Sequence, residues 1–163
     1  MELRWEDGAN QINECEYLFV DRIRELEELT LELAVTEAKV QAEVLVPRDE
    51  SAVEQLRSGA HPIERDVTCR SFRLIFDARH MVSYTVLNEL FGKFPEPPER
   101  FTGKLFRVFS WSHLLEFTKR TTHASDDFPG VLLHYQIVCL NHVVDVICTG
   151  PPRISVGVAS SAE

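Results

Sequence analysis

Two strongly β-forming runs near the end of the chain, separated by only two residues, constrain the fold more than any other feature. Residues 132–140 (LLHYQIVCL) and 143–148 (VVDVIC) are rich in β-branched and aromatic side chains. Asn141 and His142 lie between them, and asparagine tolerates the left-handed conformation that a tight hairpin turn requires. The pattern therefore predicts an antiparallel hairpin in which Leu140 pairs with Val143.

Three more runs alternate apolar with polar residues, as half-buried strands do. They cover residues 69–76, 81–90 and 105–109. The link between the first two, residues 77–80, is short and polar, so we expect these two strands to form a hairpin. The proline-rich segment 94–99 cannot donate ladder hydrogen bonds at its prolines and is expected to be a surface loop.

A helix is predicted after the third of these runs. Ser110 or Ser112 is a suitable N-cap, and the helix extends to about Thr121. Lys119 and Arg120 in its last turn complement the negative end of the helix dipole.

The N-terminal third reads less clearly. Apolar residues from Ile12 to Leu29 recur in steps of three and four, which predicts an amphipathic helix ending near residues 34–36. Between residues 29 and 46 alternation also fits a strand, so helix and strand both remain open there. Residues 40–46 are expected to be extended, and residues 51–57 to form a short helix capped by Asp49 or Ser51.

Together these elements predict a single α+β domain. We expect an antiparallel sheet of about five to six strands, an N-terminal amphipathic helix, and one helix, at about residues 112–121, between strands. The domain is predicted to span residues 1–152, and residues 153–163, which contain serine, alanine and glycine, to form a flexible tail.

The acidic charge is confined to one part of the chain. Of the formal net charge of −9, residues 1–66 hold 17 acidic and 7 basic side chains, whereas residues 67–163 hold 9 and 10. This distribution opposes direct binding to nucleic acid or to an anionic membrane. An acidic face steers a basic protein partner instead.

The cysteines and the first residues bear on the compartment. Reduced thiols are typical of the cytosol, and none of the four cysteines forms a C-x-x-C pair. The first residues lack the basic and apolar regions of a signal peptide, and no apolar run is long enough to span a bilayer. We therefore expect a cytoplasmic protein without cofactor or bound metal; the four cysteines are Cys15, Cys69, Cys139 and Cys148.

Binding residues are predicted where charge or a large aromatic ring is expected at the surface. Acidic residues of the N-terminal part are expected to attract the partner, Trp111 to anchor an interface at a strand-to-helix junction, and an acid pair to stand on a loop. The candidate binding residues are Glu25, Glu27, Glu28, Glu32, Asp49, Glu50, Trp111, Asp126 and Asp127.

A catalytic alternative rests on the predicted hairpin. Its alternation places His134 and Asp145 on one face and Cys139 on the other, so a local Cys-His-Asp triad fails. The alternative is a small enzyme whose pocket contains His134, Asp145 and Tyr84.

Binding is nevertheless the function that we expect. In size, acidity and antiparallel α+β pattern the chain resembles many bacterial immunity proteins and small inhibitors, a likeness of general type that no motif carries. It implies an immunity-type inhibitor or an adaptor without enzymatic activity. A homodimer through the apolar stripe of Phe19, Leu26 and Leu29 is a further alternative.

Overall fold

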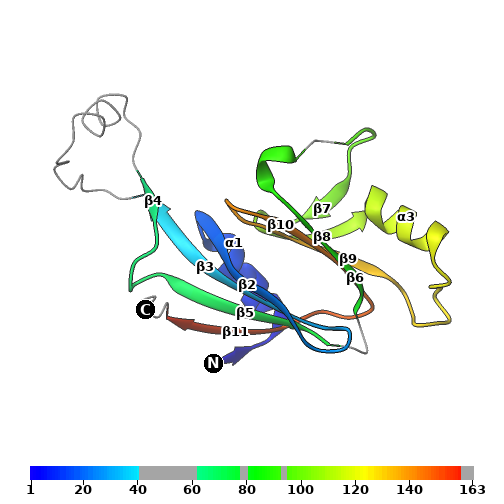
Figure 1. Cartoon of the computed structure of the whole chain (residues 1–163), viewed down its shortest axis with the longest axis horizontal. Coiled ribbons are helices and arrows are strands. Elements are labelled where there is room, and N and C mark those ends of the chain that lie inside the picture. Colours follow the sequence, from blue (N-terminus) through cyan, green and yellow to red (C-terminus); the bar gives the residue numbers. More distant parts are fainter. Residues whose placement is uncertain (41–61, 78–80, 93–94, 159–163) are drawn as a thin grey trace.

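Two antiparallel sheets packed face to face form the body of the molecule (Figure 1). The computed structural model describes residues 1–40, 62–77, 81–92 and 95–158. The class is α+β, as expected, but strands predominate and fall into two sheets where one was predicted.

The first sheet, called sheet 1, has the strand order β1-β11-β5-β3-β2, with β4 paired to β3. Its strands are β1 (Glu2–Leu3), β2 (Tyr17–Glu27), β3 (Thr30–Val40), β4 (Ile63–Glu64), β5 (Arg70–Phe76) and β11 (Arg153–Val158).

The second sheet, called sheet 2, has the order β6-β10-β9-β8-β7. Its strands are β6 (Met81–Leu87), β7 (Arg100–Thr102), β8 (Phe106–Trp111), β9 (Leu133–Val138) and β10 (Val143–Cys148). The helices are α1 (Trp5–Glu14), α3 (His113–Thr121) and the short 3-10 turn η1 (Glu89–Phe91).

The core lies between the two sheets and follows from alternation along the strands. Every second residue of a strand points to the same face, so one face of each sheet is apolar and faces the other sheet. The buried residues that meet there include Leu31, Leu33, Val35, Phe72, Leu74 and Phe76 from sheet 1 and Phe106, Tyr135, Ile137, Val144 and Val146 from sheet 2.

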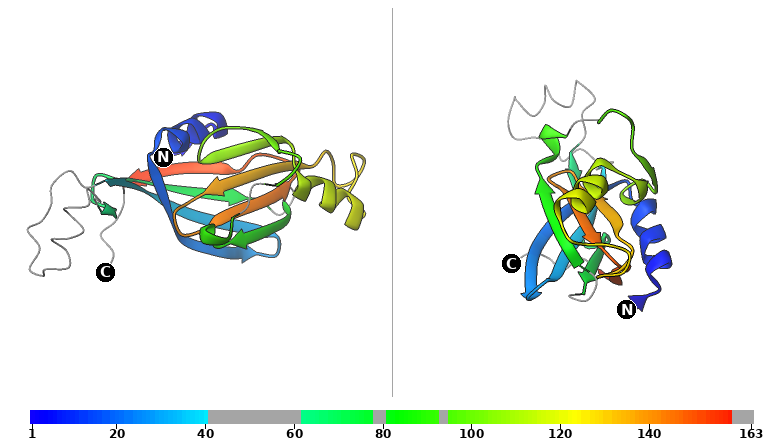
Figure 2. Two further views of the ribbon diagram at one scale, coloured as in Figure 1. Left: turned by 90° about the horizontal axis from the view of Figure 1, so that it is seen from above. Right: turned by 90° about the vertical axis from the view of Figure 1, so that its right-hand side faces the viewer.

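Helix α1 closes one open side of this sandwich (Figure 2). Gly8 permits the close approach, because a Cβ there would lie 2.7 Å from Cγ2 of Ile154 on β11. At the end of the helix, Oδ1 of Asn13 accepts hydrogen bonds from the backbone N–H groups of Lys104, Leu105 and Phe106, each at 2.8 Å. Its Nδ2 donates to the carbonyl of Phe106 at 3.2 Å. One side chain thus joins α1 to the β7–β8 turn.

The opposite side, where β2 and β6 run, is fastened by the β9–β10 turn. The side chain of Asn141 forms two hydrogen bonds with the backbone of Val20, as a neighbouring strand would. Its Oδ1 accepts from the N–H of Val20 and its Nδ2 donates to the carbonyl of Val20, both at 2.9 Å. The N–H of Leu140 also donates to the carbonyl of Leu18. These bonds satisfy backbone groups of β2 that lie beyond its pairing with β3.

The N-terminal helix predicted from Ile12 is wrong for most of its length. Helix α1 ends at Glu14, and residues 17–40 form the β2–β3 hairpin, so the strand alternative for residues 29–46 is realised up to Val40. The pairing register shifts between Val20 and Arg22. A bulge adds a residue to a strand, so the core-facing Val20 and Ile23 stand three residues apart, which is a helical spacing.

The prediction that residues 69–76 and 81–90 form a hairpin is also wrong. Both strands exist, but β5 pairs with β3 and β11 in sheet 1 while β6 pairs with β10 in sheet 2. Residues 153–158, expected to begin a flexible tail, form β11 beside β5 and β1. The extended segment and short helix predicted within residues 41–57 lie outside the described residues.

The β9–β10 hairpin and helix α3 with its Ser112 cap are confirmed. The hairpin turn is longer than predicted: Val143 pairs with Val138, and the N–H of Cys139 donates to the carbonyl of His142. The register therefore differs by two residues. An even shift leaves each side chain on the predicted face.

The three bonds accepted by Asn13 lead to a stability prediction. We expect Asn13→Ala to lower the free energy of unfolding by about 2–3 kcal/mol, since partly buried N–H groups lose their acceptor. Asn10→Ala is the control, because Asn10 is exposed on the same helix. The measurement is urea denaturation followed by fluorescence. A loss equal to that of the control would contradict the assignment.

Candidate functional site

The chemically richest group in the described structure is a chain of polar side chains on the outer face of sheet 2. Ser112 follows β8 and caps α3, its Oγ accepting from the N–H of Leu115 at 3.0 Å. His134 on β9 lies across from it, with Nδ1 2.8 Å from Oγ of Ser112. Its Nε2 lies 2.9 Å from Oδ1 of Asp145 on β10. An ionised carboxylate only accepts, so Nε2 carries a proton and, in the neutral ring, Nδ1 accepts from the Ser112 hydroxyl.

The chain continues outward to Gln136 and Arg107. Nε2 of Gln136 donates to the same oxygen of Asp145 at 2.8 Å, and Nη1 of Arg107 donates to Oε1 of Gln136 at 3.0 Å. The guanidinium of Arg107 lies 4.5 Å above the Phe101 ring. Burial lowers the pKa of Arg107, partly offset by the charge of Asp145.

Serine, histidine and aspartate in this order are the residue types of a nucleophilic triad, but the geometry does not support catalysis. A nucleophile must be reachable by substrate. Ser112 is fully buried and His134 is only 2 % exposed, with Phe109 stacked on its ring at 4.1 Å. The hydroxyl of Ser112 is also bound to the helix cap. This group therefore holds β9, β10 and α3 together.

Tyr84, the third member of the predicted enzyme pocket, lies elsewhere. The predicted pairing of His134 with Asp145 on one face is correct. Tyr84 pairs with Val146, however, and packs against the core on the other face of sheet 2. Burial, followed by the charge of Glu25 on β2, raises its pKa. The three residues do not form one pocket.

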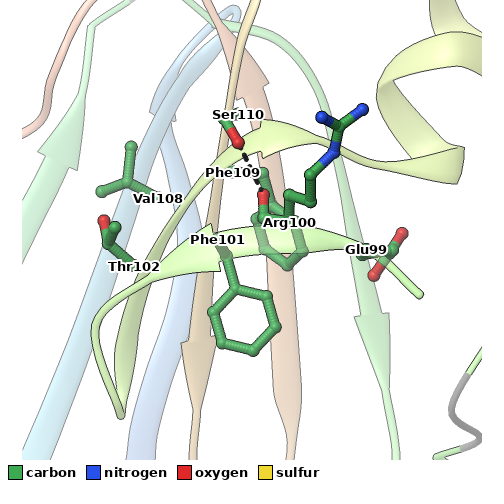
Figure 3. Close-up of a pocket in the computed structure, with 7 residues that line it drawn as sticks. All are labelled: Glu99, Arg100, Phe101, Thr102, Val108, Phe109 and Ser110. Carbon is green, nitrogen blue, oxygen red and sulfur yellow. Dashed lines mark hydrogen bonds between the residues drawn. The ribbon is translucent and has the colours of Figure 1, made fainter.

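A shallow pocket of about 510 Å³ lies at the β7–β8 edge (Figure 3). The Ser110 hydroxyl donates to the carbonyl of Arg100 at 3.2 Å, and the Arg100 side chain extends away from that of Phe101. Phe109 is shared with the polar chain around His134. The lining has no arrangement of acid, base and nucleophile; it consists of Glu99, Arg100, Phe101, Thr102, Val108, Phe109 and Ser110.

The predicted acidic surface is divided by the fold. Glu25, Glu27 and Glu28 are exposed where β2 turns into β3. Glu32 is not a surface charge: it is fully buried on the outer face of sheet 1 beneath three arginines. Asp49 and Glu50 lie outside the described residues.

The remaining predicted site residues are separated from this hairpin in the structure. Trp111 is half-buried at the end of β8, where its ring meets His113 edge to face and lies beneath the Arg100 guanidinium. Asp126 and Asp127 are exposed in the loop between α3 and β9.

The cluster around Glu32 was missed by sequence reasoning. Nε of Arg22 and Nε of Arg24 lie 3.0 and 2.9 Å from Oε1 of Glu32, and Nε of Arg73 lies 2.5 Å from Oε2. The three guanidinium groups are each about half exposed. Arg22 and Arg24 are on β2 and Arg73 is on β5, so only the pairing of both strands with β3 brings them together.

No metal centre or membrane-spanning helix emerges from this part of the chain. Within the described ranges, no three histidine, cysteine, aspartate or glutamate side chains are placed to hold a metal ion. None of the helices described there is long and apolar enough to cross a bilayer. Comparison of the chain with protein-family models, curated proteins and solved structures finds no match.

The pKa of Glu32 predicts a pH-dependent contribution to stability. Burial raises this pKa, but hydrogen bonds from Arg73 and Arg24, together with the charges of these arginines, lower it by more. The pKa of Glu32 therefore lies below its ordinary value of about 4.5. Such a group stabilises the fold above its unfolded pKa, and the contribution is lost as pH falls through the folded pKa.

We therefore expect Glu32→Gln to lower the free energy of unfolding at pH 7 by about 1–2 kcal/mol, a modest figure because the arginines are half exposed. The deficit should shrink steadily below about pH 4.5. Urea titrations of both proteins between pH 7 and 3 measure it, with Glu96→Gln at an exposed position as control. A deficit that is constant across this range would refute the ionic account.

Proposed function

We propose that the chain is a non-enzymatic protein-binding domain, an inhibitor or adaptor, that docks a basic partner through the tip of the β2–β3 hairpin. The hairpin tip comprises residues 25–29 (ELEEL), all of them exposed. It lies at the end of two 11-residue strands, at one end of the sandwich (Figure 1).

The conformation of Leu29 carries the proposal. Leu29 has φ of 58°, in the left-handed region that glycine and asparagine adopt easily, and it is 47 % exposed. A bulky residue in this conformation costs about 1–2 kcal/mol. About half of the residue is covered, so packing offsets only part of that cost. Strained residues of this kind occur at binding sites, where the side chain contacts a partner.

The charges around Leu29 indicate the kind of partner. Glu27 and Glu28 make no ion pair with any other described residue, in contrast to Glu32, whose charge three arginines surround. Leu26 is also exposed, so the hairpin tip presents apolar side chains among carboxylates. A partner with an apolar pocket rimmed by lysine or arginine would match it in both respects.

Neutralising the hairpin tip should slow association. We expect the triple variant Glu25→Gln, Glu27→Gln, Glu28→Gln to associate about tenfold more slowly at low ionic strength, since rim charges act chiefly on the association rate. The control triple, Glu16→Gln, Glu64→Gln, Glu96→Gln, alters exposed positions elsewhere and makes the same change in net charge, from −9 to −6.

For the measurement, the partner is captured from native extract by a photo-reactive residue at Leu26, purified, and assayed by surface plasmon resonance at two salt concentrations. Equal rates for the two triple variants would refute docking by the hairpin tip, because both have the same overall charge.

A second test separates stability from binding at one residue. Asparagine accepts the left-handed conformation, so Leu29→Asn should raise the free energy of unfolding by about 1 kcal/mol while weakening partner binding. Leu26→Asn is the matched control, expected to weaken binding without the gain in stability. Urea denaturation and the same binding assay provide both readouts. Unchanged binding by Leu29→Asn would contradict the proposal.

A further inference from the structure

The outer strands of the two sheets differ in how well they are protected. An unpaired strand edge exposes backbone N–H and C=O groups to any other strand, and proteins guard edges by shortness, bulges, charges or prolines. β1 has two residues, and β7 has three with a register shift. β2 carries charged side chains and two register shifts, and the side chain of Asn141 is hydrogen-bonded to its Val20.

β6 has few of these protections. Its seven residues, MVSYTVL, include no charge, proline or glycine, and the one register irregularity falls at its first residues. Among the described residues, its ladder hydrogen bonds run to β10 alone, so from Val82 to Leu87 every second residue directs its N–H and C=O outward.

Apolar surface accompanies this free edge. Val86 and Leu87 at the end of β6 are more than two-fifths exposed, and in η1 just beyond them Leu90 and Phe91 are 83 % and 76 % exposed. Exposed apolar side chains beside an unpaired edge are characteristic of an interface.

We propose that β6 pairs with β6 of a second copy of this chain, antiparallel about a two-fold axis at Tyr84, so that the two copies of sheet 2 become one continuous sheet. This register sets Ser83 opposite Thr85, both on the outer face of sheet 2, so that polar residues meet polar ones, as a symmetric interface requires.

The placement of charge favours a second copy as the occupant. β6 itself is uncharged, so pairing with an identical strand opposes no like charges. The acidic hairpin tip lies beside the start of β6, whereas η1 lies at the other end of β6 (Figures 1 and 2). In the antiparallel pair each hairpin tip therefore lies near the partner's η1.

The same pairing covers exposed apolar side chains of β6 itself, Val86 and Leu87. Basic-partner binding by the hairpin tip does not depend on this pairing, so either proposal can fail alone.

The test is sedimentation velocity on the full chain from 1 to about 500 μM. We expect concentration-dependent dimerisation that Thr85→Lys weakens about tenfold or more, because an edge lysine blocks strand addition. Thr102→Lys is the matched control: the same substitution at an exposed residue of β7, on the opposite edge of the same sheet. It should dimerise like the wild type.

A wild-type chain that stays monomeric throughout this range would overturn the proposal, and so would dimers that both lysine variants weaken equally. Circular dichroism confirms that each variant is folded. If Thr85→Lys fails to fold, Leu87→Lys replaces it, since Leu87 is exposed on the same strand. Dimerisation that survives Leu87→Lys would also place the interface elsewhere.

Discussion

Backbone groups at the edges of the two sheets are the constraint on which the rest of this structure depends. Packing two apolar sheet faces together leaves the sandwich open along its sides, where N–H and C=O groups need partners. Two asparagines supply many of them. Asn13 accepts three backbone N–H groups of residues 104–106, and Asn141 forms two bonds with Val20. Each joins segments more than 90 residues apart in the chain.

Polar side chains that hold the fold together in this way are not free to act at a functional site. Histidine and aspartate are reactive residue types, yet His134 binds both Asp145 and Ser112, the cap of α3. Glu32 is held by three arginines, so the outer face of sheet 1 is not an acidic surface. Among the described residues of the β2–β6 side, exposed features include the acidic hairpin tip with Leu29 and the edge strand β6. Both proposals therefore concern one side of the molecule.

Local patterns predicted local structure well. The β9–β10 hairpin and the Ser112 cap of α3 depend on residues near one another in sequence, and both were expected. The faces of His134 and Cys139 were also expected, because they survive a two-residue change of register. The bulge after Val20 gave β2 an apolar spacing that imitates a helix, and no local signal distinguished the two. The contacts of Asn13, Asn141 and Glu32 depend on strand pairing across the chain, so spacing could not reveal them.

Residue-resolved hydrogen exchange on dilute, monomeric protein tests this account of edge closure most directly. The account predicts slow exchange at the amides of Val20, Leu105 and Phe106, whose acceptors are asparagine side chains. It predicts fast exchange at alternate amides from Val82 to Leu87, whose edge is open. Fast exchange at Val20 and Leu105, or uniform protection along β6 in the monomer, would contradict it.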